Sequence, residues 1–248
     1  MNNLGLKKHI FSCIIVKEYL WSNQQNFMVE GTGLEKTMYK HIVFDIDGTL
    51  VDNEKAILHS LQEVLLKTMG KKFSFEQLNF CLGIPGEDTL ERLGVEDIPG
   101  VINLWIEALR RCEDMVTIHT GIEELLRELS DRGYKLGLAS SRSRELLEKD
   151  FGKLKIDKYF EIKVCADDTL EHKPTGAPLM KYMELAEADK SEVLYIGDSV
   201  HDSMCAGDAG VDFALAVWGS HTEETPAKYY LRTPSDLLPI LEGDEHQI

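Results

Sequence analysis

Short apolar segments alternate with longer amphipathic segments from Met38 onward, and this alternation constrains the fold more than any other feature. Strands that are buried on both faces read as continuous apolar runs, and helical segments between them indicate parallel βαβ units. The sequence therefore predicts an α/β fold with a doubly wound, Rossmann-like parallel sheet. The five predicted strands are Ile42–Phe44, Leu136–Ala139, Ile162–Cys165, Val193–Ile196 and Phe213–Val217.

Two of the helices expected between or after these strands have recognisable ends. Thr120 followed by Glu123 has the spacing of a capping box and predicts a helix over Gly121–Arg132. Gly133 stands where a helix C-cap is expected. The pair Thr233-Pro234 predicts the start of a last short helix that runs through Leu241.

A long interval separates the first predicted strand from the second. It holds about ninety residues, far more than one crossover needs. Helical patterns fill much of it, over Ala56–Met69, Phe75–Cys81, Glu87–Leu93 and Val101–Glu113. We therefore predict an all-helical insertion over residues 53–117, which acts as a cap on a core domain built from residues 38–52 and 118–248.

Residues 1–37 do not share this pattern and are expected to lie outside the catalytic fold. Ile10–Val16 is a short apolar run, but Lys17 follows at once and no small-residue cleavage site is nearby, so a signal peptide is not indicated. Two interpretations stay open. Either Met38 is the true start of the protein, or the first 37 residues form an arm of it.

Charge and composition exclude several classes of partner and cofactor. The net charge of -16 opposes binding to nucleic acid, whose phosphates are held mainly by Lys and Arg. No apolar run reaches the roughly 18 residues of a membrane span. The five cysteines include no Cys-x-x-Cys pair, which is typical of reduced thiols in the cytoplasm. The eight histidines lack zinc-ligand spacing. A monomer and a homodimer both remain open.

Two carboxylates follow the first predicted strand. Asp45 and Asp47 are two residues apart, so in extended chain their side chains project to the same side. Gly48 lets the backbone turn away, and Thr49 can hold that turn by hydrogen bonding. This arrangement allows Asp45 to attack a phosphorus atom while Asp47 gives a proton to the leaving oxygen and later takes one from water.

Later strands end in further polar residues. Ser140 follows the second strand and can offer its hydroxyl to a phosphate oxygen. Lys173, fixed by Pro174 ahead of a predicted helix, can neutralise charge between a carboxylate and an incoming phosphate. Asp198 suits a hard cation, and Asp202 lies one helical turn further on. The carboxyl ends of strands meet in one crevice of a doubly wound sheet, so these residues are expected to converge.

These four motifs, in this order, resemble the haloacid dehalogenase-like (HAD) superfamily. Within it, the chain is most similar to the phosphoglycolate phosphatase and β-phosphoglucomutase group, whose helical cap is inserted after the first motif. The resemblance runs from Met38 to about Leu241. It implies a phosphatase with an aspartyl-phosphate intermediate on Asp45, an acid/base at Asp47, and phosphoryl contacts from Ser140 and Lys173.

The same resemblance implies a magnesium ion held by Asp45, the Asp47 backbone carbonyl and Asp198, with Asp202 in support. Further phosphate or substrate contacts are expected from Thr49, Ser141, Arg142, Gly83 and Gly86. The chain departs from the group at Ser141-Arg142, where Asn-Lys is frequent, and in the residues after Lys173-Pro174. Both departures leave the expected chemistry intact and concern the local contacts to the phosphate and the leaving group.

The expected substrate is a small phosphorylated metabolite, and phosphoglycolate, sugar phosphates, nucleotides and pyrophosphate all stay open. A phosphomutase is the alternative, although its relatives tend to carry an acid where this chain has Gly197. A catalytically silent binding protein would be expected to have lost one of Asp45, Asp47 or Asp198, and all three are present. A dehalogenase is disfavoured because halide displacement has no use for Asp47 and Asp198.

Overall fold

The computed structural model describes residues 39–82, 86–151, 154–222 and 224–243. The predicted extension over residues 1–37 and the predicted substrate contact Gly83 lie outside these ranges.

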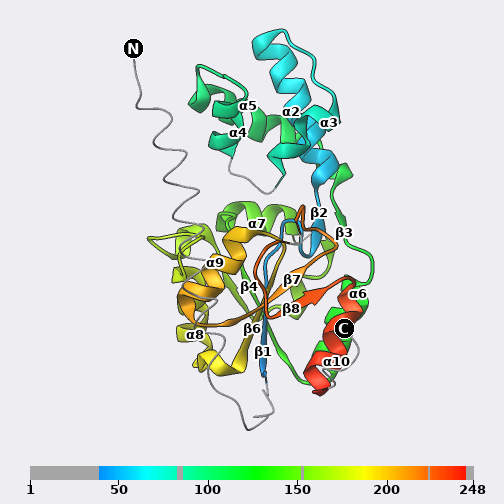
Figure 1. Ribbon diagram of the computed structural model, residues 1–248, viewed down its shortest axis with the longest axis vertical. Coiled ribbons are helices and arrows are strands. Elements are labelled where there is room, and N and C mark those ends of the chain that lie inside the picture. The colour runs from blue at the N-terminus through cyan, green and yellow to red at the C-terminus, as the bar shows by residue number, and fades with distance from the viewer. Residues whose placement is uncertain (1–38, 83–85, 152–153, 223, 244–248) are drawn as a thin grey trace. The chain divides into compact units, whose positions relative to one another are not determined.

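A six-stranded, all-parallel sheet forms the centre of the described chain, in the order β5-β4-β1-β6-β7-β8 (Figure 1). Each of the five predicted strands is present within one residue of its expected ends. The short edge strand β8 was not predicted from the sequence. The strands are β1 (His41–Phe44), β4 (Lys135–Ala139), β5 (Ile162–Val164), β6 (Val193–Gly197), β7 (Asp212–Ala216) and β8 (Tyr229–Leu231).

Side chains alternate across the sheet and build a separate hydrophobic core on each face. Ile42 and Phe44 of β1 pack into one core, whereas Val43 packs into the other. Helices α6 (Ile122–Asp131) and α10 (Leu237–Glu242) contribute to the first core, and α8 (Ala177–Ala186) and α9 (Val200–Ala209) to the second. Figure 1 shows these two pairs on opposite sides of the sheet. The predicted doubly wound α/β fold is thus confirmed.

The ends of two predicted helices differ in detail from the sequence expectation. The N-cap of α6 is Gly121, with a φ of 89° and no side-chain cap hydrogen bond, so the predicted capping box of Thr120 and Glu123 is wrong. Because Gly121 takes the left-handed conformation, the chain turns into the helix one residue later than predicted. Thr233 precedes a 3-10 turn, Pro234–Asp236, and α10 follows it.

The predicted insertion over residues 53–117 is helical. Its helices carry their own hydrophobic cluster, which includes the fully buried Leu61, Leu65, Leu78 and Leu90. The two-residue strands β2 (Val51–Asp52) and β3 (Thr117–Ile118) pair where the chain enters and leaves this interval. Its helical elements are α2 (Glu54–Met69), α3 (Phe75–Leu78), η1 (Asn79–Cys81), α4 (Gly86–Arg92), α5 (Ile98–Arg111) and η2 (Glu113–Met115).

Two composition-based expectations can be compared with the described residues. The four cysteines in this part of the chain, Cys81, Cys112, Cys165 and Cys205, are buried free thiols. None of the described helices combines the length and the apolar character needed to cross a membrane.

We expect Leu126→Ala to lower the free energy of unfolding by about 2–5 kcal/mol, because this fully buried residue of α6 would leave a cavity in the core. The control is Leu185→Ala on α8, where the side chain is 52% exposed and the change should stay within about 0.5 kcal/mol. Urea unfolding followed by circular dichroism measures both. Similar losses for the two variants would contradict the assigned core.

Candidate active site

The carboxyl ends of three neighbouring strands carry the predicted site residues. Asp45 follows β1, Ser140 follows β4, and Asp198 follows β6. Strand β1 lies between β4 and β6 and pairs in parallel with both, so the three residues meet at one edge of the sheet. This is the topological switch point, where open α/β sheets form their ligand crevice.

A buried lysine joins two of the predicted carboxylates. The Lys173 Nζ donates to Asp45 Oδ1 at 2.6 Å and to Asp202 Oδ1 at 2.7 Å. The Lys173 side chain is only 6% exposed, and both carboxylates are buried with it. Oxygen atoms of Asp45, Asp198 and Asp202 lie within 4.8 Å of one another. The structure therefore brings Lys173 and three of the predicted metal-binding residues into one cluster.

Burial and mutual repulsion govern the ionisation of this cluster. Burial is the largest influence on Asp45 and raises its pKa to about 7, with Asp202 and Asp47 acting in the same direction and Lys173 opposing them. Burial alone would lower the pKa of Lys173, but Asp202 and Asp45 raise it, so the ammonium keeps its charge. The pKa of Asp202 falls despite burial, because Lys173 and hydrogen bonds from Ser199 and Tyr195 favour the anion.

Asp198 is the member of the cluster without a directly bonded cation among the described residues, although the charge of Lys173 acts to lower its pKa against the larger effects of burial and the other carboxylates. It is 9% exposed, and burial together with Asp202 and Asp45 raises its pKa well above the usual range. No Lys or Arg of the described chain forms an ion pair with it, and Thr49 Oγ1 donates to its Oδ1 at 3.3 Å. Three close carboxylates with one lysine leave uncompensated charge, and hard oxygen ligands suit Mg²⁺. The residues thus fit a divalent cation.

The loop after Asp45 approaches the cluster closely because it contains a glycine. Gly48 has a φ of +80°, and a Cβ there would lie 2.3 Å from Asp198 Oδ2. Gly219 supports the loop from the other side, where a Cβ would lie 1.7 Å from the Gly48 carbonyl oxygen. The Trp218 indole also donates to the Thr49 carbonyl at 2.9 Å. Backbone contacts therefore fix the loop that carries Asp45 and Asp47.

Asp47 is held by two side chains that come from different parts of the chain. Arg142 donates to both of its oxygens, from Nε at 2.8 Å and from Nη2 at 2.5 Å. Asn53 Nδ2 donates to Oδ1 at 2.5 Å. The residue that the sequence assigned to phosphate thus contacts the predicted acid/base. Ser140, also a predicted phosphate contact, is 3% exposed, and its Oγ accepts from the Arg142 backbone N–H at 3.2 Å.

Tyr195 is a site neighbour that the sequence analysis missed. Its hydroxyl donates to Asp202 Oδ1 at 2.8 Å, and its ring lies 5.4 Å from the Lys173 Nζ. Tyr195 is fully buried in β6, where the pattern of a core strand gave no reason to separate it from its apolar neighbours. The only available signal was its position, three residues before Asp198.

A cavity of about 350 Å³ opens over the cluster. Six of the predicted site residues line it. Five carry charge, namely Asp45, Asp47, Lys173, Asp198 and Asp202, and the sixth is Ser141. Gly48 and Leu82 also line it, and residues that sequence reasoning missed complete the lining: Asn53, Glu54, Ile57, Ser199, His201, Gly219 and His221.

Four predicted phosphate or substrate contacts are not among the lining residues: Ser140 and Arg142, described above, and Thr49 and Gly86. Thr49 is fully buried and bonds to Asp198, away from the cavity lining. Gly86 begins α4 and faces α5, where a Cβ would lie 3.1 Å from Ile102 and 3.3 Å from Trp105. The close packing of α4 against α5 therefore explains why a glycine stands at position 86.

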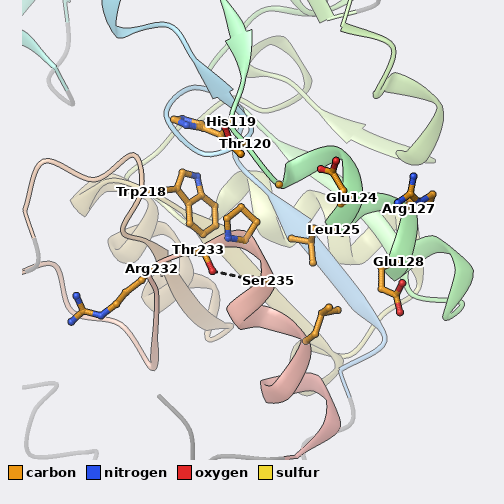
Figure 2. A pocket seen from close by; sticks show the side chains of 13 residues that line it. His119, Thr120, Glu124, Leu125, Arg127, Glu128, Trp218, Arg232, Thr233 and Ser235 are labelled. Atoms are coloured by element: carbon orange, nitrogen blue, oxygen red, sulfur yellow. Dashed lines mark hydrogen bonds between the residues drawn. The ribbon is translucent and has the colours of Figure 1, made fainter.

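A larger cavity of about 590 Å³ shares no lining residue with the first. It lies between α6 and the segment 232–238, with Trp218 and His119 at one end (Figure 2). Asp45, Asp198 and Asp202 do not line it, so the smaller cavity is the candidate active site.

Comparison with known proteins gives the class of this site. The family model for haloacid dehalogenase-like hydrolases matches residues 42–216, which include every carboxylate of the cluster. The chain belongs to the haloacid dehalogenase-like hydrolase family.

Individual relatives agree with this assignment. A Caldanaerobacter subterraneus protein provisionally named pyrophosphatase PpaX is 30% identical, over 83% of this chain and 97% of its own. The pyrophosphatase PpaX of Bacillus mycoides is 28% identical, over 81% and 95%. A Lactobacillus plantarum crystal structure provisionally named phosphoglycolate phosphatase is 29% identical with a TM-score of 0.75, covering 82% of this chain and 99% of that one.

We expect Gly219→Ala to disturb the site more than the fold, because the added methyl group would collide with the Gly48 carbonyl and push the Asp45–Asp47 loop. Turnover should fall at least about tenfold. The control is Gly133→Ala, which has open space around it but a positive φ, and so tests backbone strain without a collision. Full activity in folded Gly219→Ala would contradict this role for the glycine.

Proposed function

We propose that the chain is a magnesium-dependent phosphatase that hydrolyses small phosphorylated metabolites through a phosphoryl group carried on Asp45. The observation that carries this proposal is the contact of Lys173 with Asp45 at the floor of the cavity. A phosphate dianion and a carboxylate repel each other, and a buried ammonium bonded to the nucleophile reduces that repulsion.

In the first step, an Asp45 oxygen forms a bond to phosphorus as the bond from phosphorus to the leaving oxygen breaks. The electron pair of the broken bond stays on the leaving oxygen. Asp47 gives that oxygen a proton where the leaving group needs one. Lys173 stays between Asp45 and Asp202, so it can hold a non-bridging phosphoryl oxygen without moving far.

In the second step, Asp47 takes a proton from a water molecule that attacks the phosphorus. The bond from Asp45 to phosphorus breaks, inorganic phosphate leaves, and the Asp45 carboxylate is restored. Ser140, Ser141 and backbone N–H groups at the end of β4 are assigned to the phosphoryl oxygens.

The side chains of Asp45, Asp198 and Asp202, with the Asp47 carbonyl, would hold the magnesium ion. When bound, the ion supplies positive charge that offsets the carboxylates and the substrate phosphate. The acidic chain can in this way bind an anion.

The helical segment over residues 53–117 is proposed as a cap that excludes water and selects the substrate. Four residues from it, Asn53, Glu54, Ile57 and Leu82, line the cavity. Because relatives carry the names pyrophosphatase and phosphoglycolate phosphatase, both compounds belong in a first substrate panel.

Hydrolysis is favoured over a phosphomutase by the position of Gly197. A Cβ at this glycine would lie 2.5 Å from the Asp202 Cβ, so the acid found in phosphomutase relatives has no room without moving Asp202. A cytoplasmic location, the absence of nucleic-acid binding and a monomeric or dimeric state stay predictions.

Asp45→Asn should abolish turnover without unfolding the protein, because an amide of the same volume cannot attack phosphorus. Phosphate release from a metabolite panel, with thermal unfolding in parallel, measures both effects. Asp131→Asn, an exposed acid on α6, is the matched control and should keep wild-type activity. Near wild-type turnover in purified Asp45→Asn protein would rule out the covalent step.

Removing divalent ions with a chelator should stop phosphate release, and adding Mg²⁺ should restore it. Asp198→Asn should weaken Mn²⁺ binding at least about tenfold by titration calorimetry, since it removes one charged ligand from the cluster. The same change at Asp131 should leave the affinity unaltered. Equal Mn²⁺ affinity in Asp198→Asn and wild-type protein would remove Asp198 from the metal site.

A further inference from the structure

The cavity over the cluster is poor in fixed positive charge. Five carboxylates line it, from Asp45, Asp47, Glu54, Asp198 and Asp202. Among its described lining residues, Lys173 is the single Lys or Arg, and it bonds to Asp45 and Asp202 at the floor. One lysine and one divalent cation together do not balance five acids. A substrate that carries a second anionic group therefore needs another cation beside its leaving group.

The helical insertion does not supply that cation among its described lining residues, which are Asn53, Glu54, Ile57 and Leu82. Arg92, the last residue of α4, has its guanidinium carbon 4.3 Å from the centre of the Phe80 ring. Arg142 does not line the cavity itself, but its guanidinium bonds to both oxygens of Asp47, which does line it.

The core domain fixes Arg142 from both sides. Its backbone N–H donates to Ser140 Oγ at 3.2 Å, and its carbonyl accepts from Ala166 N–H at 2.9 Å. The side chain is 19% exposed, so most of the guanidinium's surroundings are protein. Hydrogen bonds to a charged group in such a setting are stronger than those at an open surface.

We propose that Arg142 is a specificity-determining residue that selects substrates whose leaving group carries its own oxyanion, with phosphoanhydrides such as inorganic pyrophosphate as the simplest class. This inference rests on the proposed phosphatase function and deepens it.

Arg142 selects the substrate by exchanging a hydrogen bond to Asp47 for one to an oxyanion of the leaving group. In the substrate-free protein both Asp47 oxygens accept bonds from Arg142, and Asn53 adds a third. Asp47 must give up at least one of these contacts to reach a leaving oxygen. A second oxyanion on the substrate offers Arg142 a replacement of the same charge and fork geometry. A neutral leaving group offers none, so Asp47 stays held.

The exchange also accounts for the bond-breaking step with a phosphoanhydride. The Asp45–phosphorus bond forms, the anhydride bond breaks, and its electron pair stays on the departing phosphate. The Arg142 guanidinium binds the departing phosphate and stabilises its negative charge. Phosphate is a far weaker base than an alkoxide, so it depends less on a proton from Asp47 than an alcohol does.

Titration calorimetry with Mg²⁺ in excess tests this on the full-length protein without any turnover. The probes are methylenediphosphonate, which cannot be hydrolysed and carries a second anionic group, and methylphosphonate, which does not. Wild-type protein should bind methylenediphosphonate at least about tenfold more tightly, the scale of a charge-assisted contact. Arg142→Gln should reduce this preference to within about threefold while binding methylphosphonate as before.

Arg142→Lys keeps the charge but loses the fork, so an intermediate preference is expected. Arg132→Gln is the matched control, because Arg132 also contacts two carboxylates, Glu128 and Glu242, on a remote surface. It should keep the wild-type preference. If Arg142→Gln does not fold, the wild-type ratio and Arg142→Lys still decide the matter. An equal affinity of wild-type protein for the two probes, or an unchanged preference in a folded Arg142 variant, overturns the proposal.

Turnover separates this inference from the proposed function. Wild-type protein that releases phosphate from glycerol 2-phosphate as fast as from pyrophosphate would be a phosphatase without the selection proposed for Arg142. Wild-type protein that prefers methylenediphosphonate but releases phosphate from no substrate would lose the phosphatase assignment and keep the anion contact. Equal loss of turnover on both substrates in Arg142→Gln would make Arg142 a positioning residue for Asp47 alone.

Discussion

The contact of Lys173 with Asp45 and Asp202 is the interaction on which the site depends. Three carboxylates within 4.8 Å of one another repel strongly in a buried setting, and the ammonium between two of them offsets part of that repulsion. The balance is incomplete, because Asp198 lacks a basic partner among the described residues. This shortage of positive charge at the cluster makes a bound cation favourable. The charge that destabilises the cluster is the same charge that would favour a divalent cation there.

The geometry of the sheet explains why such a costly cluster can be held in place. Asp45 and Asp198 follow adjacent parallel strands, whose backbone hydrogen bonds fix their separation. Gly48 allows the intervening loop to approach Asp198, and Trp218 holds the same loop by its Thr49 carbonyl. Most of the rigidity thus comes from backbone contacts. Side chains at the site are left to differ in charge and length, and these differences set the chemistry.

The sequence predicted the parts of the molecule that repeat a strong local pattern. Apolar strands such as Val193–Ile196 were placed within one residue, because burial on both faces demands a continuous run. Asp45, Lys173, Asp198 and Asp202 were identified as neighbours, because strand ends in a doubly wound sheet converge. The edge strand β8 and the two-residue pair β2–β3 carry too few residues to form a pattern. The roles of the site residues and the division into core and cap stay predictions.

Arg142 and Asn53 show where local sequence reasoning stops. Asn53 stands at the N-cap of α2, a position where asparagine commonly caps the helix, yet its side chain makes no cap hydrogen bond. It bonds to Asp47 instead. Arg142, which lies 95 residues after Asp47 in the sequence, bonds to the same carboxylate. No local rule predicts that either donor serves a carboxylate on another element. The structure thus relates two departures from ordinary local behaviour to one acceptor. Asp47 in this way joins the loop after β1 to one donor at the start of α2 and another that follows β4, which links three elements at the mouth of the predicted site.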